Sequence, residues 1–231
     1  MQPLYGITTY HYPTALEPII QFSTTPLILV VNANQPWQTL DDLIAYCKEN
    51  PGKVKFGHAG IGDTTHIVGA LLAEKTGISI EEVPFRGSSE STAALLGDHI
   101  QVVCSSPGPL TEQIKAGTLR ALATSGEKHF TNPTLANIPT FKELGFDIVL
   151  ENWYGIVSPK EMDPKIKHKL ADALAKMVAD PEFKLNIEKL GMEVHYLNSE
   201  DLITRWHEDK EKLSKMINET GIIEKIKQQK Q

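Results

Sequence analysis

A glycine-rich stretch between a short strand and a helix constrains this sequence more than any other feature. Residues 57–62 read Gly-His-Ala-Gly-Ile-Gly, directly after an alternating segment that contains Val54 and Phe56. An amphipathic segment follows, with Asp63 or Thr64 as its expected N-cap. Glycines let successive N–H groups point at one place, and the following helix adds unpaired first-turn amides and its positive dipole end. The pattern predicts an anion-binding loop, although a tight turn without a ligand fits the residues equally well.

Strands and helices alternate along most of the chain, with short loops between them. The run Leu27–Val31 is continuously apolar, as expected for a buried parallel strand. Residues 1–20 are expected to form a loop with a short helical turn. The expected N-caps of four helices are Thr39, Asp163, Asp180 and Ser199. The helix that starts at 164 should carry one apolar stripe, formed by Ile166, Leu170, Leu174 and Met177. Further strands are expected at 53–58, 78–85, 100–104, 119–124, 148–157 and 193–197, and helices at 40–49, 64–76, 88–96, 109–116, 140–144, 164–179, 181–190 and from 199 onward. This order predicts an α/β fold with a largely parallel sheet.

Composition excludes several classes of protein. The chain has 231 residues, of which 41% are hydrophobic and 23% charged, so it can bury a full core and is not a disordered chain. Its net charge of −6, without a basic block, argues against a nucleic-acid partner. No apolar run approaches the length of a membrane span, and Cys47 and Cys104 are expected to be small buried side chains. Residues 1–4 do not resemble a signal peptide, so we expect the chain either to be cytoplasmic or to lack its natural beginning.

Other polar residues follow the neighbouring strands. Arg86, Gly87 and Ser88 come after one expected strand, and Ser105 and Ser106 come after the next. Because the carboxyl ends of parallel strands share one edge of a sheet, these residues could meet the same ligand as the glycine loop. Ser88 or Ser89 is also the expected N-cap of the helix that follows. A simple surface arginine is as good an interpretation of Arg86.

Catalytic and metal chemistry find little support. The loop lacks the Lys-Ser/Thr of a nucleotide-binding P-loop and the glycine order of a dinucleotide fold. His58, Asp63 and His66 match no standard zinc spacing. Cys104 has no evident base, and no nucleophile elbow is present. We therefore expect no catalytic residue, no metal site and no cofactor.

Several segments together resemble the solute receptors of tripartite tricarboxylate transporters, the Bug or TctC-like family. Residues 56–67 are similar to that family's G-S-x-G-x-G-S/T-x-x-H-L segment. Similar segments continue in unbroken order over about residues 20–215, at 83–87, where the family usually has V-P-Y-K-G, and then at 114–123, 138–140 and 152–159. Each segment alone is weakly specific, but the set is specific.

The resemblance implies a two-lobed fold of the type II periplasmic binding protein kind, whose α/β lobes close over a small carboxylate by a hinge motion. Residues 1–28 and 125–231 would form a first lobe that is incomplete at its N-terminus, and residues 29–124 a second lobe with the glycine loop. The crossing strands would be 27–31 and 119–125. In this family backbone amides and bound waters of the loop hold one carboxylate. The ligand-binding residues expected here are Ala59, Gly60, Gly62, Thr64, Thr65, Arg86, Gly87 and Ser88, with Ser105 added from its strand end.

The function that the resemblance implies is that of a non-enzymatic receptor. It would bind a di- or tricarboxylate or an aromatic acid in the periplasm or outside the cell. Ligand binding would favour a closed form that the membrane subunits of the transporter recognise. Three alternatives remain: a cytoplasmic ligand-sensing regulatory domain, although no basic helix-turn-helix is visible; an enzyme with His58 or His66 as general base; and a truncated remnant that no longer binds.

One departure from the family pattern concerns the first lobe. Family members begin with a secretion signal and then a strand, a glycine-rich loop and a helix that hold the opposite side of the ligand, whereas this chain starts after them. A lobe without its central strand would expose apolar surface and sheet edges. We therefore expect a homodimer that covers the incomplete lobe. Asp63, Phe85 and Arg86 are smaller departures that bear on which ligand is favoured.

Overall fold

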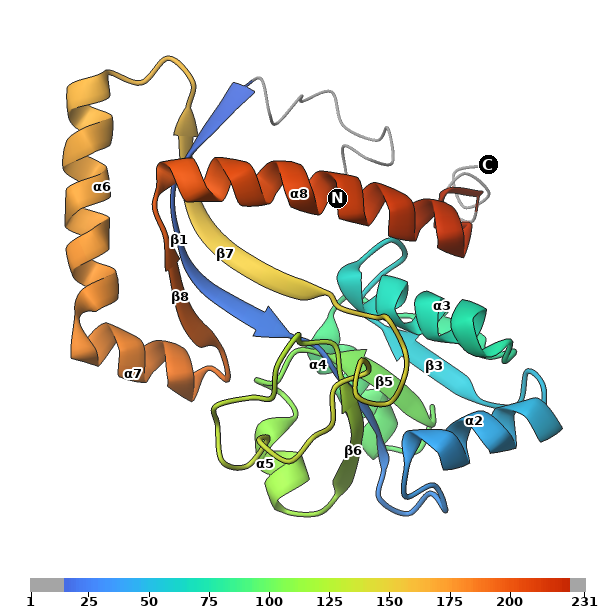
Figure 1. Cartoon of the computed structure of the whole chain (residues 1–231). Helices are drawn as coiled ribbons and strands as arrows, with labels where there is room; N and C mark the ends of the chain where they lie inside the picture. The colour runs from blue at the N-terminus through green and yellow to red at the C-terminus, as the bar shows by residue number, and fades with distance from the viewer. Residues whose placement is uncertain (1–14, 225–231) are drawn as a thin grey trace. The chain divides into compact units, whose positions relative to one another are not determined.

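The computed structural model describes residues 15–224, which form two compact units (Figure 1). Among these residues, unit 1 comprises 15–25 and 152–215, and unit 2 comprises 26–151 and 216–224. The first division falls close to the expected one after residue 28. The second differs, because residues 125–151 group with the unit that carries the glycine loop and not with the first lobe.

Unit 2 is built on a sheet with the strand order β4-β3-β5-β2-β6. Its elements are β2 (Ile28–Asn32), α2 (Leu40–Glu49), β3 (Lys55–His58), α3 (Thr64–Thr76), β4 (Glu81–Pro84), α4 (Ser88–Leu96), β5 (Val102–Ser105), α5 (Thr111–Lys115) and β6 (Leu119–Thr124). This confirms the predicted alternation of strands and helices.

The direction of β2 corrects the sequence prediction. Strands β4, β3 and β5 run parallel, but β2 is antiparallel to both of its neighbours, β5 and β6. The prediction of a parallel strand at Leu27–Val31 was therefore wrong. A continuous apolar run indicates that both faces of a strand are buried, and it carries no information about strand direction.

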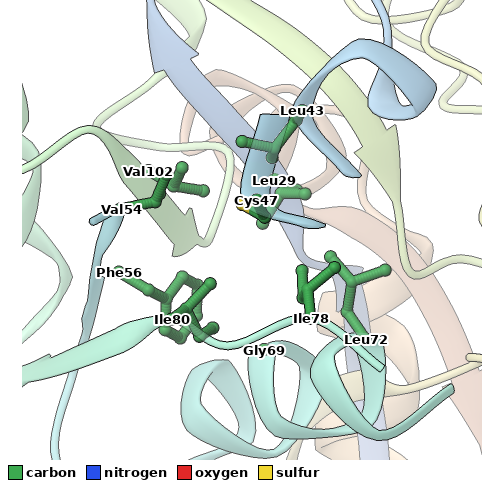
Figure 2. A pocket seen from close by; sticks show the side chains of 10 residues that line it. All are labelled: Leu29, Leu43, Cys47, Val54, Phe56, Gly69, Leu72, Ile78, Ile80 and Val102. Carbon is green, nitrogen blue, oxygen red and sulfur yellow. The ribbon is translucent and has the colours of Figure 1, made fainter. Parts of the chain in front are cut away.

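Both faces of the unit 2 sheet are covered by apolar side chains. Ile28, Val30 and Val103 face a core cluster that includes Leu95 of α4 and Leu110, which precedes α5. The alternate face meets α2 and α3. Figure 2 shows an apolar pocket on this face, lined by residues of β2, α2, β3, α3 and β5 and of the segments that lead into β3 and β4: Leu29, Leu43, Cys47, Val54, Phe56, Gly69, Leu72, Ile78, Ile80 and Val102.

Several helix boundaries follow from their capping residues. Thr39 caps α2 through a capping box with Asp42, and Asp63 caps α3 by accepting from the Thr65 amide. These predictions are confirmed. The prediction that Ser88 or Ser89 caps α4 was wrong, because Gly87 is the N-cap and no side chain caps that helix. The expected helix at 140–144 is a single turn closed by Thr140 and Glu143.

Unit 1 contains a sheet of the order β7-β1-β8 among the described residues. Its elements are β1 (Leu16–Pro26), β7 (Glu151–Pro159), α6 (Pro164–Ala179), α7 (Pro181–Lys189), β8 (Glu193–Leu197) and α8 (Ser199–Thr220), the last turn of which groups with unit 2. A loop with a short helical turn was expected at residues 1–20. Residues 16–20 are instead the start of β1, and residues 1–14 lie outside the described part.

The core of unit 1 is small. One cluster consists of Ile19, Ile20 and Val178, with partly buried side chains of α6, α7, β7 and β8 around them. Ile187 of α7 and Leu202 of α8 are also buried. The predicted apolar stripe of α6 is only partly covered: Leu174 and Met177 pack against this cluster. Ile166 and Leu170 are 54% and 39% exposed. Within residues 15–224, no helix combines the length and the apolar character needed to span a membrane.

Candidate ligand-binding site

The glycine loop connects β3 to α3 at the carboxyl end of β3, which lies between β4 and β5. Gly60 and Gly62 have φ angles of 132° and 77°, in the region that side chains other than glycine rarely adopt. The Asp63 amide donates to the Gly60 carbonyl, which closes the turn directly before the helix. The sequence needs glycine at both positions for this geometry.

The amides expected to bind an anion already have partners within the chain. The Ala59 N–H donates to Thr65 Oγ1 at 2.8 Å, Gly60 N–H to His58 Nδ1 at 3.3 Å and Gly62 N–H to His66 Nδ1 at 3.0 Å. An amide that donates to a buried side chain must leave it before it can donate to a ligand. The loop in this conformation is therefore closed on itself.

Asp63 supplies a negative charge at the N-terminus of α3. Its Oδ1 accepts from the Thr65 amide at 2.9 Å, from Thr65 Oγ1 at 2.8 Å and from Thr64 Oγ1 at 3.4 Å. A carboxylate there satisfies the first-turn donors and interacts favourably with the helix dipole. Thr64 and Thr65 are thus capping partners of Asp63 in this conformation.

Two buried imidazoles complete the loop. The rings of His58 and His66 stack with their centroids 4.2 Å apart, and both residues have no exposed surface. Because each Nδ1 accepts an amide proton, each neutral ring carries its own proton on Nε2. His66 Nε2 lies 3.4 Å from Glu82 Oε2, which is within ion-pair distance but lacks hydrogen-bond geometry. Among the described residues, neither the Nε2 of His58 nor that of His66 has a hydrogen-bond partner.

Burial and, to a smaller extent, the neighbouring His66 lower the pKa of His58 to about 4. The charges of Glu82 and Asp63 act in the opposite direction but are weaker. His58 is therefore neutral at physiological pH. Its Nδ1 lone pair remains available to the loop.

The other predicted residues lie at the ends of the strands beside β3. The Phe85 amide donates to the His58 carbonyl at 2.9 Å, which joins the end of β4 to the start of the loop. Arg86 and Gly87 come next, with the Arg86 amide bonded to Glu90 Oε2 at 2.9 Å and its side chain exposed. The Ser88 carbonyl accepts from the hydroxyls of two residues in α4.

Ser105 ends β5 on the other side of β3. It is fully buried, and its hydroxyl donates to the Ser106 carbonyl at 3.3 Å. The register pairs Gly57 with Val103, so Ser105 lies two residues further toward the loop edge. The expectation that the candidate residues share one edge of the sheet agrees with the parallel pairing of β4, β3 and β5. Which of them contact a ligand remains a prediction.

Sequence reasoning considered His58 and His66 as bases or metal ligands and missed their role as acceptors for loop amides. A signal was present, since His58 stands two residues before Gly60, the spacing at which a side-chain acceptor reaches a turn amide. Among the residues that the structure describes, no three His, Cys, Asp or Glu side chains are grouped to hold a metal. Cys47 and Cys104 are free and buried, as predicted.

Comparison with known proteins identifies the family. The family model described as "Tripartite tricarboxylate transporter family receptor" matches residues 3–222. The chain belongs to this receptor family. It is similar to the Cupriavidus necator protein named "UPF0065 protein in gbd 5'region", with 38% identity over 209 residues, which cover 90% of this chain and 62% of the relative. The chain thus spans less than two thirds of the length of that relative.

Solved structures confirm the α/β fold of this family's periplasmic solute-binding proteins. The periplasmic binding protein BugD is 27% identical, with a TM-score of 0.80, and the match covers 92% of this chain and 73% of BugD. The R. palustris protein Rpa4515, solved with adipate, is 22% identical with a TM-score of 0.83 over 92% of this chain and 71% of Rpa4515, and this likeness shows the fold alone.

Proposed function

We propose that the chain is a non-enzymatic receptor for a small carboxylate, which unit 2 binds at the edge where β4, β3 and β5 end. The observation that carries the proposal is that this edge brings together the glycine loop, Arg86 and Ser105 in a chain of the receptor family. Arg86 is the exposed cation at this edge, and the glycine amides are the neutral donors. Together they suit an anion that is held by charge and by hydrogen bonds.

Membership of the family supports a wider role. We propose that the loaded receptor delivers its ligand in the periplasm to the membrane subunits of a tripartite tricarboxylate transporter. In this proposal the ligand favours the conformation that the membrane partner recognises, so it acts by shifting a population. A dicarboxylate is the first ligand to test, because Rpa4515, which shares the fold, was solved with adipate.

Thermal unfolding with succinate, adipate, citrate or benzoate tests the proposal. Ligand at a hundred times its Kd stabilises the protein by about 2.7 kcal/mol, which raises Tm by roughly 5–10 °C for a chain of this size. A rise with one acid, followed by a measured Kd, is the expected result. A sharp transition that none of these acids moves contradicts the proposal.

Two variants locate the site. Arg86→Gln removes the cation and should weaken carboxylate binding, whereas Lys75→Gln removes an exposed cation at the other end of α3 and should leave it unchanged. Gly60→Ala strains the loop backbone and should abolish binding. Its matched control is Gly77→Ala, which strains the C-cap of the same helix at φ 69° without touching the loop. Equal losses in both glycine variants would place the site elsewhere.

We further propose that a second copy of the chain covers unit 1. Its exposed large apolar side chains are Tyr154, Val157, Ile166, Leu170, Leu185, Leu190, Tyr196 and Ile203, and both β7 and β8 are edge strands in the described sheet. Uncovered edges and apolar side chains favour association of chains. Light scattering should show a dimer that Ile166→Glu dissociates. A monomer at micromolar concentration contradicts this proposal.

A further inference from the structure

Two histidines hold the glycine loop of unit 2 in place from both sides. His58 precedes the loop and accepts the Gly60 N–H, and His66 follows it on α3 and accepts the Gly62 N–H. Both imidazoles are fully buried and stacked on each other. The backbone conformation of the loop thus depends on two nitrogen lone pairs.

An imidazole has this lone pair only while it is neutral. In the imidazolium form both ring nitrogens carry protons and both donate. Protonating His58 would therefore place a ring N–H against the Gly60 N–H at the present 3.3 Å separation. The bond would be lost, and two donors would face each other inside a buried site, which costs free energy.

We propose that His58 and His66 are positioning residues that accept the loop amides and keep the glycine loop closed on itself, and that protonation of His58 opens the loop and releases its amides. The Gly60 N–H would then be free to donate to an external acceptor. Because the turn is lost as well, the Gly62 N–H would also become available. The link from this opening to carboxylate binding rests on the proposed function, whereas the opening itself does not.

The groups around His58 determine the pH at which the ring is protonated and the loop opens. Asp63 on the loop and Glu82 on β4 are the carboxylates whose charges act on His58, and His66 on α3 faces it ring to ring. Cys104 on β5 is buried, which raises the pKa of its thiol, so it is uncharged. The pKa of about 4 for His58 keeps the loop closed at neutral pH and places its opening at acid pH. A bound carboxylate would favour the protonated ring and move the opening toward neutrality.

A pH titration of the amide resonances tests the opening. In ¹H–¹⁵N spectra between pH 7.5 and 4, the Gly60 and Gly62 amides should shift together with the His58 ring resonances and lose their protection from exchange. Gly77, whose amide bonds the Ala73 carbonyl at the far end of α3, should stay unchanged. Loop amides that stay constant while His58 titrates would overturn the proposal.

Variants separate this role from simple packing. His58→Asn retains an acceptor at the distance of a turn amide but does not titrate, so its Gly60 amide should be protected at every pH. His58→Phe retains a stacked ring but accepts no bond, so its loop should be open at every pH. His168→Asn changes a histidine that is 81% exposed on α6 and should behave like the native protein. If His58→Phe fails to fold, His58→Asn alone decides, because a Gly60 amide that still titrates in that variant refutes the proposal.

Calorimetry with adipate tests the link to binding. In buffers of different ionisation enthalpy at pH 5.5, native protein should take up close to one proton more for each adipate bound than His58→Asn does, since the comparison cancels the protons that adipate itself exchanges. Equal proton uptake in the two proteins would refute the link while leaving the titration of the loop intact. No binding of adipate or of any acid in the panel above would instead count against the proposed function.

Discussion

Leu29 in unit 2 and Leu170 in unit 1 both lie in segments whose pattern predicts a buried apolar residue, but Leu29 is fully buried and Leu170 is 39% exposed. In unit 2 the sheet is covered on both faces, and nearly all of the large buried side chains belong to it. In unit 1 five apolar side chains of the described residues are buried, Ile19, Ile20, Val178, Ile187 and Leu202. The comparison teaches that a helical stripe indicates which face turns inward, whereas burial also requires a partner to cover that face.

The two units are alike in their local chemistry. In unit 2 Thr39 caps α2, and in unit 1 Asp163 caps α6 with a proline in the first turn. Capping and turn formation depend on neighbours in the sequence, so helix ends are capped in the same way in both units. The units therefore differ in their tertiary packing, and the stability of variants in each unit measures this difference.

The largest expected effect is the loss of a core side chain from unit 2. Phe56 is 1% exposed, and its ring occupies the place that a side chain at Gly69 would need, since a Cβ there would lie 2.2 Å from the ring. Phe56→Ala should lower the free energy of unfolding by about 3–5 kcal/mol. Urea denaturation measures it, with Tyr154→Ala of unit 1, 40% exposed, as the control that should cost much less. Equal losses of stability in the two variants would show that the two units do not differ in packing.

Acid should destabilise unit 2 selectively. The pKa of His58 is about 4 in the folded protein and about 6.5 when unfolded, so its neutral form is favoured by folding. The stability this contributes is fully present above pH 6.5 and is lost as the pH falls toward 4. Between pH 7 and pH 5 the free energy of unfolding should fall by about 2 kcal/mol. Urea midpoints at both pH values should show this fall in the native protein and a smaller one in His58→Asn.

Loss of an N-cap should have a smaller effect, similar in the two units. Thr39→Ala removes the acceptor for the Asp42 amide, and Asp163→Ala removes the acceptor for the Lys165 amide. Each should cost about 1 kcal/mol. Amide exchange across α2 and α6 measures the local effect. A cap that mattered only in unit 2 would show that the units differ in more than their packing.

The smallest effect is expected for the exposed stripe of α6. Leu170→Ser replaces a side chain that is 39% exposed and should change the stability of the monomer by less than about 1 kcal/mol. If unit 1 is covered by a second copy, the same change should weaken the dimer in light scattering. A large loss of monomer stability would mean that α6 is packed more tightly than its exposure indicates.

The fold class could be predicted because strands, helices and most caps have local signals. Asp63, Asp163 and Asp180 all cap the helices that were predicted for them. The misassigned cap of α8 has a tertiary cause. The Ser199 hydroxyl donates to the Pro18 carbonyl in β1, and Asn198 takes the Asp201 amide instead.

Other features had no local signal at all. Strand β1 contains buried polar residues, Gln21 and Ser23 among them, that bond to the backbone of β8, so no apolar pattern marks it. At the candidate site, the glycines predicted a loop that could bind an anion. The sequence did not show that His58, Thr65 and His66 would occupy its amides, because that depends on which side chains point back into the loop.

The antiparallel placement of β2 has a consequence for how the chain folds. Strand β2 opens unit 2, yet both of its partners come much later, and the Thr124 hydroxyl bonds the Leu27 carbonyl across 97 residues. Closing such long loops slows folding. At ribosomal rates of about 5–20 residues per second, the apolar segment 27–31 waits roughly 5–20 s for β6 to be synthesised. During that time one edge of this apolar strand has no partner, which favours aggregation of the nascent chain.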